Sequence, residues 1–150
     1  MQSLFEKHSL QSIVQRVQSI SNTSERKWGS MTPAQMLWHC KAPLKIALRK
    51  EQKSIKINPV KKLLFRLFKS SLYNDKPWKH NLPTPEAFVA KEEFTIEQEK
   101  EELLNLIHAF YERRDQNEWM PHPYFGTFTK EQWGQMQFKH LDHHLKQFNT

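Results

Sequence analysis

The chain of 150 residues contains one cysteine, Cys40, and only three glycines. A lone cysteine excludes an internal disulfide, fits a reducing compartment and is expected to be a small core residue. Long hydrophobic runs are also missing, and charged residues interrupt the first twenty positions where a signal peptide would need an apolar core. We therefore expect a cytoplasmic protein with no membrane span.

Sustained alternation of β-branched and polar residues, the signature of strands, is absent as well. Together with the few glycines, this absence favours an all-α protein. The length suits one hydrophobic core, and nothing in the composition suggests a second one. We predict a single domain over residues 1–150.

Two of the expected long helices lie in the first third of the chain. Apolar residues at helical spacing predict the first from about residue 3 to 20. The second should begin at Thr32, with Pro33 in the first helical position and Gln35 completing a capping box. Pro43 is expected to kink this helix, because its ring clashes with the carbonyl group one turn earlier.

Two further long helices are marked by capping signals. Thr95 followed by Gln98 predicts the start of the third, and Thr129 followed by Gln132 predicts the start of the last. A short basic amphipathic helix should begin at Asn58-Pro59, and two long loops complete the chain. These elements predict a four-helix bundle, a fold that builds metal sites from inward side chains on facing helices.

The last helix carries the residues most suggestive of chemistry. His140 and His144 lie four positions apart, so both imidazoles can point to one place, as ligands of a divalent transition metal do. Trp133, Met136 and Gln147 fall on the same face, within about 40° of His140 at 100° per residue. The opposite face is expected to hold Lys139, Asp142 and Lys146.

A structural role remains open for this pair, because an inward histidine is often a hydrogen-bonded core residue. His143 lies about 60° from His140, toward the polar rim, and is expected to be solvated or to support a ligand from behind.

Two segments resemble the DinB/YfiT-like superfamily. Residues 31–39 (MTPAQMLWH) are similar to its second helix, and residues 122–129 (HPYFGTFT) with the H-x-x-x-H pair and Gln147 are similar to its final loop and helix. The resemblance implies an antiparallel, metal-binding four-helix bundle in which His39, His140 and His144 hold a divalent metal, most often nickel or zinc. Characterised relatives include metal-dependent transferases that use low-molecular-weight thiols, and proteins described as hydrolases.

The resemblance assigns no catalytic or substrate-binding residue. Residues 50–90 match nothing in the superfamily, and Leu145-Lys146 stands where relatives often carry Arg-Gly. We expect a small-molecule substrate such as a low-molecular-weight thiol. A homodimer remains open.

Charge is unevenly distributed and supports a second hypothesis. Lys41 to Lys69 contains ten Lys or Arg residues against one acid, whereas Glu92 to Glu102 contains six glutamates. A basic segment could bind an anionic partner or nucleic acid, with the metal structural or vestigial. We favour the enzyme, because single-strand binding also needs exposed aromatic residues and only Phe65 and Phe68 lie nearby.

Overall fold

The computed structural model describes residues 1–49, 65–84 and 86–150. Within these residues the regular secondary structure is helical and there is no strand, apart from one isolated bridge between His122 and Gly126. None of their helices is both long enough and apolar enough to cross a bilayer. The elements are α1 (Lys7–Ser19), α2 (Pro33–Ala47), α4 (Ile96–Tyr111), α5 (Lys130–Gln147) and the short 3₁₀ helices η1 (Lys69–Leu72) and η2 (Glu86–Phe88).

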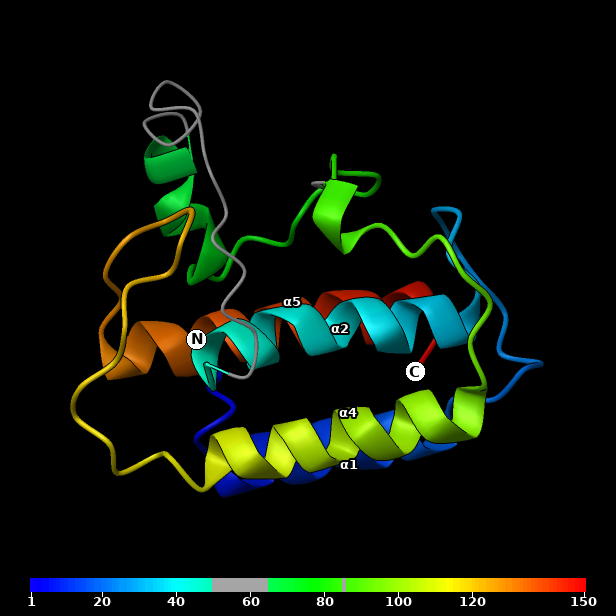
Figure 1. Cartoon of the computed structure of the whole chain (residues 1–150), viewed down its shortest axis with the longest axis horizontal. Coiled ribbons are helices and arrows are strands. Elements are labelled where there is room, and N and C mark those ends of the chain that lie inside the picture. Colours follow the sequence, from blue (N-terminus) through cyan, green and yellow to red (C-terminus); the bar gives the residue numbers. More distant parts are fainter. Residues whose placement is uncertain (50–64, 85) are drawn as a thin grey trace.

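The long helices pack in two layers, α1 with α4 and α2 with α5, and α2 and α4 share the most extensive interface. In Figure 1, α1 and α5 run from left to right, whereas α2 and α4 run from right to left. The expected antiparallel direction thus applies within each layer, and α2 and α4 run parallel. The green chain between α2 and α4 crosses over the α2–α5 layer on the side away from α1 and α4.

Local capping explains where two of these helices begin. The side chains and backbones of Thr32 and Gln35, and likewise of Thr129 and Gln132, form the expected capping boxes. α4 also begins after Thr95, but the expected side-chain cap does not form. Gln98 instead points along the helix and donates to Glu102.

α1 begins at Lys7 rather than near residue 3, because residues 4 and 5 form a turn before it. The helix expected from Asn58 falls largely outside the described residues, although residues 65–67 are helical. α2 contains Pro43 and continues to Ala47, and the kink expected at Pro43 stays a prediction.

One apolar core joins all four long helices. Its fully buried side chains include the aromatic rings of Phe110, Trp133 and Phe148. Cys40 belongs to this core, as expected, and burial raises the pKa of its thiol. The thiol is therefore protonated at neutral pH and suited to packing.

The basic segment from Lys41 to Lys69 does not present all of its cations to solvent, because Lys41 forms a buried ion pair. The ammonium group of Lys41 lies 2.5 Å from carboxylate oxygens of both Glu99 and Glu102. The side chains of Lys41 and Glu99 are only 4% and 5% exposed, so the pair joins α2 to α4 within the protein interior. Lys41 is thus satisfied internally and is not presented to an anionic partner.

Lys139, expected on the helix face opposite His140, is buried by the crossover segment between α2 and α4. Its side chain is buried, and its ammonium donates to the carbonyl oxygens of Ser71 and Asn74 and to Asn74 Oδ1, at 2.7 to 2.8 Å. Trp78 Nε1 also donates to the Ser71 carbonyl. Lys139 thereby fastens the crossover segment to α5.

We predict that Lys41→Met lowers the free energy of unfolding by about 3 to 5 kcal/mol, because the buried carboxylate of Glu99 loses its partner. Lys91→Met, which breaks the exposed pair with Glu86, should cost much less, because water screens that pair. Urea denaturation measures both variants. Equal losses in the two variants would contradict the buried position of the Lys41–Glu99 pair. The double variant Lys41→Met/Glu99→Leu should recover much of the lost stability, because no buried charge is then left without a partner.

Candidate metal centre

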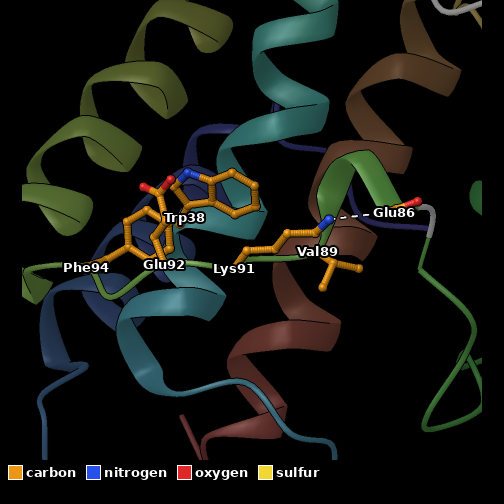
Figure 2. A pocket seen from close by; sticks show the side chains of 6 residues that line it. All are labelled: Trp38, Glu86, Val89, Lys91, Glu92 and Phe94. Carbon is orange, nitrogen blue, oxygen red and sulfur yellow. Dashed lines mark hydrogen bonds and ion pairs between the residues drawn. The ribbon is translucent and has the colours of Figure 1, made fainter.

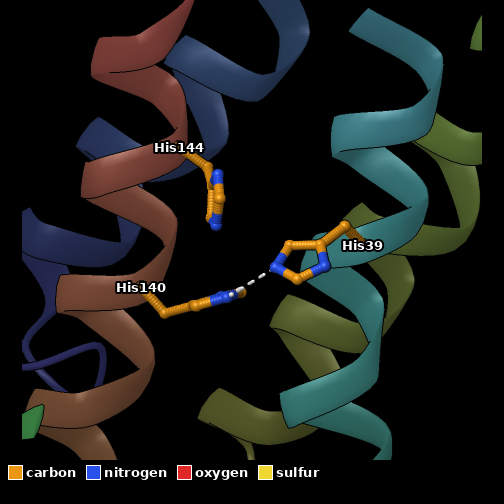
Figure 3. A group of neighbouring side chains, drawn as sticks. All are labelled: His39, His140 and His144. Atoms are coloured by element: carbon orange, nitrogen blue, oxygen red, sulfur yellow. Dashed lines mark hydrogen bonds between the residues drawn. The ribbon is translucent and has the colours of Figure 1, made fainter. Parts of the chain in front are cut away.

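The structure brings His39, His140 and His144 together at the interface between α2 and α5. One ring nitrogen from each residue lies within 4.8 Å of those from the other two. Figure 3 shows the imidazole of His39 projecting from α2 toward the two imidazoles of α5. The i, i+4 spacing places His140 and His144 one helical turn apart on the same face, as the sequence predicts.

The crossover segment fixes the orientation of His39. Its Nδ1 lies 2.9 Å from the carbonyl oxygen of Phe88. A carbonyl can only accept, so in this network Nδ1 carries the proton and Nε2 carries the lone pair. That lone pair faces His140, whose Nε2 lies 3.2 Å away.

His140 is the residue whose bonding is incomplete. Two unprotonated nitrogens at 3.2 Å repel unless a proton or cation lies between them. If His140 Nε2 donates the proton to His39, its Nδ1 is left as a bare acceptor. That atom is buried and has no hydrogen-bond partner among the described residues, so the metal-free arrangement leaves a polar atom unsatisfied.

His144 is oriented from behind by Gln147. Its Nδ1 lies 3.0 Å from Gln147 Oε1, which leaves Nε2 as the metal-facing nitrogen. The described residues thus offer three imidazoles and no carboxylate or thiolate to the cluster. Such a set fits zinc or nickel and leaves coordination positions open for another ligand.

Burial keeps the three imidazoles neutral. It lowers the pKa of His39 against an opposing hydrogen bond to Phe88. It lowers the pKa of His140 far below its usual value, with the neighbouring histidines adding to the effect. The pKa of His144 falls to about 3, again chiefly through burial. Neutral imidazole is the form that binds metals, so these ligands need no deprotonation at pH 7.

Aromatic rings surround the outer side of the cluster. Trp78, held by Lys139 and Ser71, places its ring 6.0 Å from that of His140 and 5.5 Å from that of His143. His143 is half-buried and lies outside the three-histidine group. Its expected role, solvated or supporting a ligand from behind, stays a prediction. Trp28 contacts His143 and stacks on His80 at 3.8 Å.

Two other candidate residues lie apart from the cluster. Cys40 follows His39 in α2 but contacts Met36 rather than the imidazoles. His122 accepts a hydrogen bond from the backbone N–H of Tyr124 and packs among aromatic rings, and burial lowers its pKa to about 3. Both are core residues.

A surface pocket of about 240 Å³ lies beside α2 but contains none of the three histidines (Figure 2). The rings of Trp38 and Phe94 stack at one side of it, and Lys91 reaches across to pair with Glu86 at 2.8 Å. Val89 and Glu92 complete the lining. This pocket therefore supplies no ligand to the candidate metal centre.

The fold and the cluster together define an all-helical protein with three neutral imidazoles gathered between two helices. Residues 2–150 match the model of the family described as "Protein of unknown function (DUF1569)". The chain belongs to this family. No curated protein and no solved structure matches the chain.

Sequence patterns alone missed the groups that orient the histidines. The Phe88 carbonyl gives no side-chain signal, because any residue could supply it. Gln147 falls on the inner face of the last helix, which indicates proximity to the pair but not a bond to His144. The burial of Lys139 has no local signal, since its partners lie 65 and 68 residues away in sequence.

We predict that stability falls as pH drops from about 6.5, the ordinary pKa of histidine, because the unfolded chain then binds protons that the buried imidazoles exclude. For His144 the loss should continue toward about pH 3. Each such histidine contributes a slope of up to about 1.4 kcal/mol per pH unit. Urea denaturation from pH 7 to pH 4, with a chelator present, measures the slope.

Replacing one buried imidazole should flatten this dependence. His144→Gln should remove one histidine's share of the slope, whereas Gln11→Leu, an exposed substitution on α1 that changes no titratable group, should leave it unchanged. Identical slopes for wild type and His144→Gln would contradict the neutral, buried assignment.

Proposed function

We propose that the protein is a metal-dependent enzyme in which His39, His140 and His144 bind one divalent ion, zinc or nickel, that activates a thiol or water. The observation that carries the proposal is the convergence of three neutral imidazoles between α2 and α5. The Nδ1–H groups of His39 and His144 donate to Phe88 and Gln147, and these bonds direct Nε2 of both rings inward. Metal-binding histidines commonly make such outer hydrogen bonds.

The proposed chemistry is that of a thiol transferase or hydrolase. When bound, the ion would lower the pKa of a coordinated thiol or water toward neutrality and so supply a nucleophile. Phe88 and Gln147 hold two imidazoles in the required orientation. The ring of Trp78 lies beside those of His140 and of the half-buried His143, on the outer side of the cluster. The substrate in this proposal is a small molecule, such as a low-molecular-weight thiol.

The proposal extends to the fold type, an antiparallel bundle of the DinB/YfiT-like kind. Support comes from the packing of four long helices around one core and from the position of the histidines on the second and last of them. A long crossover between α2 and α4 is among the connections that four-helix bundles use.

The alternative, an anionic or nucleic-acid partner for the basic segment, receives less support from the described residues. Lys41 is buried in ion pairs, and the Phe65 ring packs against Tyr124 and Phe125. Lys69 lies over the Phe128 ring and donates to the Thr127 carbonyl. The cations at positions 50–64 lie outside the described residues.

We predict about one zinc or nickel ion per chain in protein purified and then loaded with either metal, as expected for a single three-histidine site. His39→Ala, His140→Ala and His144→Ala should each lose the ion, whereas His143→Ala should retain most of it. Elemental analysis measures the metal, and far-UV circular dichroism establishes that each variant is folded. Retention of the ion by folded His39→Ala would refute the three-residue site.

The loaded protein should conjugate a small thiol to an electrophile, or hydrolyse an ester or amide, and the metal-free protein should not. Activity should fall at low pH as protons displace the ion. Because the buried imidazoles have lowered pKa values, this loss should begin below about pH 6. Rates measured with and without metal from pH 8 to pH 5 test this expectation.

A loaded protein without turnover across such a panel would favour the binding alternative. Nucleic-acid affinity that falls steeply with salt would then support it, because phosphate contacts release counterions.

A further inference from the structure

Gln147, at the end of α5, connects the cluster to the loop between α1 and α2. Its Oε1 lies 3.0 Å from His144 Nδ1, and its Nε2 donates to the carbonyl oxygen of Trp28 at 2.7 Å. The Trp28 carbonyl can only accept, so it determines which end of the amide carries the NH₂ group. The amide oxygen must then face His144, and His144 must carry its proton on Nδ1.

The loop holds Gln147 by its backbone as well. The N–H of Lys27 donates to the carbonyl oxygen of Gln147 at 2.8 Å. Gln147 is only 3% exposed, so both of its connections to the loop are largely shielded from water. The amide therefore has little freedom to rotate away from His144.

The loop between α1 and α2 can approach Gln147 closely because residue 29 is a glycine. Its φ of +80° suits glycine, and a Cβ atom at this position would collide with the amide nitrogen of Gln147. A side chain here would push Gln147 out of line with both of its partners. The glycine thus keeps the space that the amide occupies.

The three histidines differ in what orients them. A backbone carbonyl binds His39, and no described residue binds Nδ1 of His140. Within the described residues, only His144 has its Nδ1 bound by a side chain, so a substitution outside the cluster can change its orientation selectively.

We propose that Gln147 is a positioning residue that sets the tautomer and ring orientation of His144 for metal binding, with the Trp28–Gly29 loop as its anchor. This inference rests on the proposed metal site. It assigns the N-terminal loop a part in that site although the loop supplies no ligand.

Two substitutions at Gln147 separate this role from a structural one. Gln147→Leu removes both the acceptor for His144 and the donor to Trp28. Gln147→Glu also removes the donor to Trp28, but its carboxylate still accepts from His144 Nδ1. If orientation of His144 matters, Gln147→Leu should bind zinc about 10- to 100-fold more weakly, and Gln147→Glu should stay much closer to wild type.

Zinc affinity is measured at pH 7.5 by competition with a chromophoric chelator, and cobalt absorption spectra report the geometry of the site. Gln11→Leu, an exposed glutamine on α1, is the matched control and should leave both unchanged. Thermal unfolding of the metal-free variants accounts for any general loss of stability. Equal weakening in the two Gln147 variants, or no weakening in either, would overturn the proposal.

A measurement on the wild-type chain keeps the test independent of variant folding. Long-range ¹H–¹⁵N NMR spectra distinguish the two imidazole tautomers, and His144 should carry its proton on Nδ1 both with and without zinc. A proton on Nε2 in the metal-free protein would overturn the proposal. Failure of the wild type to bind zinc or cobalt would instead refute the proposed function, and with it any metal role of Gln147, while the NMR result still decides whether Gln147 sets the tautomer.

Discussion

The need to satisfy buried imidazoles governs the arrangement between α2 and α5. A buried polar atom without a partner is costly, and the cluster contains six ring nitrogens in a small volume. Phe88 and Gln147 bind the outer nitrogens of His39 and His144, which turns both lone pairs inward. The 3.2 Å contact between His39 and His140 then requires a shared proton or a cation. A shared proton meets this requirement without a metal, and the ion in the proposed function would meet it in another way.

The same requirement ties the connecting segments to the helices. The crossover supplies the Phe88 carbonyl to His39, and the loop before α2 supplies the Trp28 carbonyl to Gln147. Lys139 fastens the crossover a second time, which holds Trp78 against His140. Because α2 and α4 run parallel, a long crossover must span the length of the α2–α5 layer. This topology brings the crossover within reach of the histidines.

Local chemistry explains what the sequence predicts well. The starts of α2 and α5 depend on Thr, Pro and Gln residues within one helical turn, and both capping boxes form. The pairing of His140 with His144 follows from helical spacing alone. His39 is different, because only the resemblance of residues 31–39 to a known family predicted that it joins His140 and His144. Thr95 shows the limit of local patterns: Gln98 can bond to Glu102 instead of to the cap, and does.

Long-range partners explain what the sequence cannot predict. Lys41 and Lys139 count as surface charges in any sum along the chain, yet each lies buried against oxygen atoms of a distant segment. A net charge therefore overstates the cationic surface that a partner could contact. Burial has the opposite consequence for the three imidazoles, because it makes them more available for binding. Burial lowers the pKa of all three, which favours their neutral form and leaves their lone pairs available for binding.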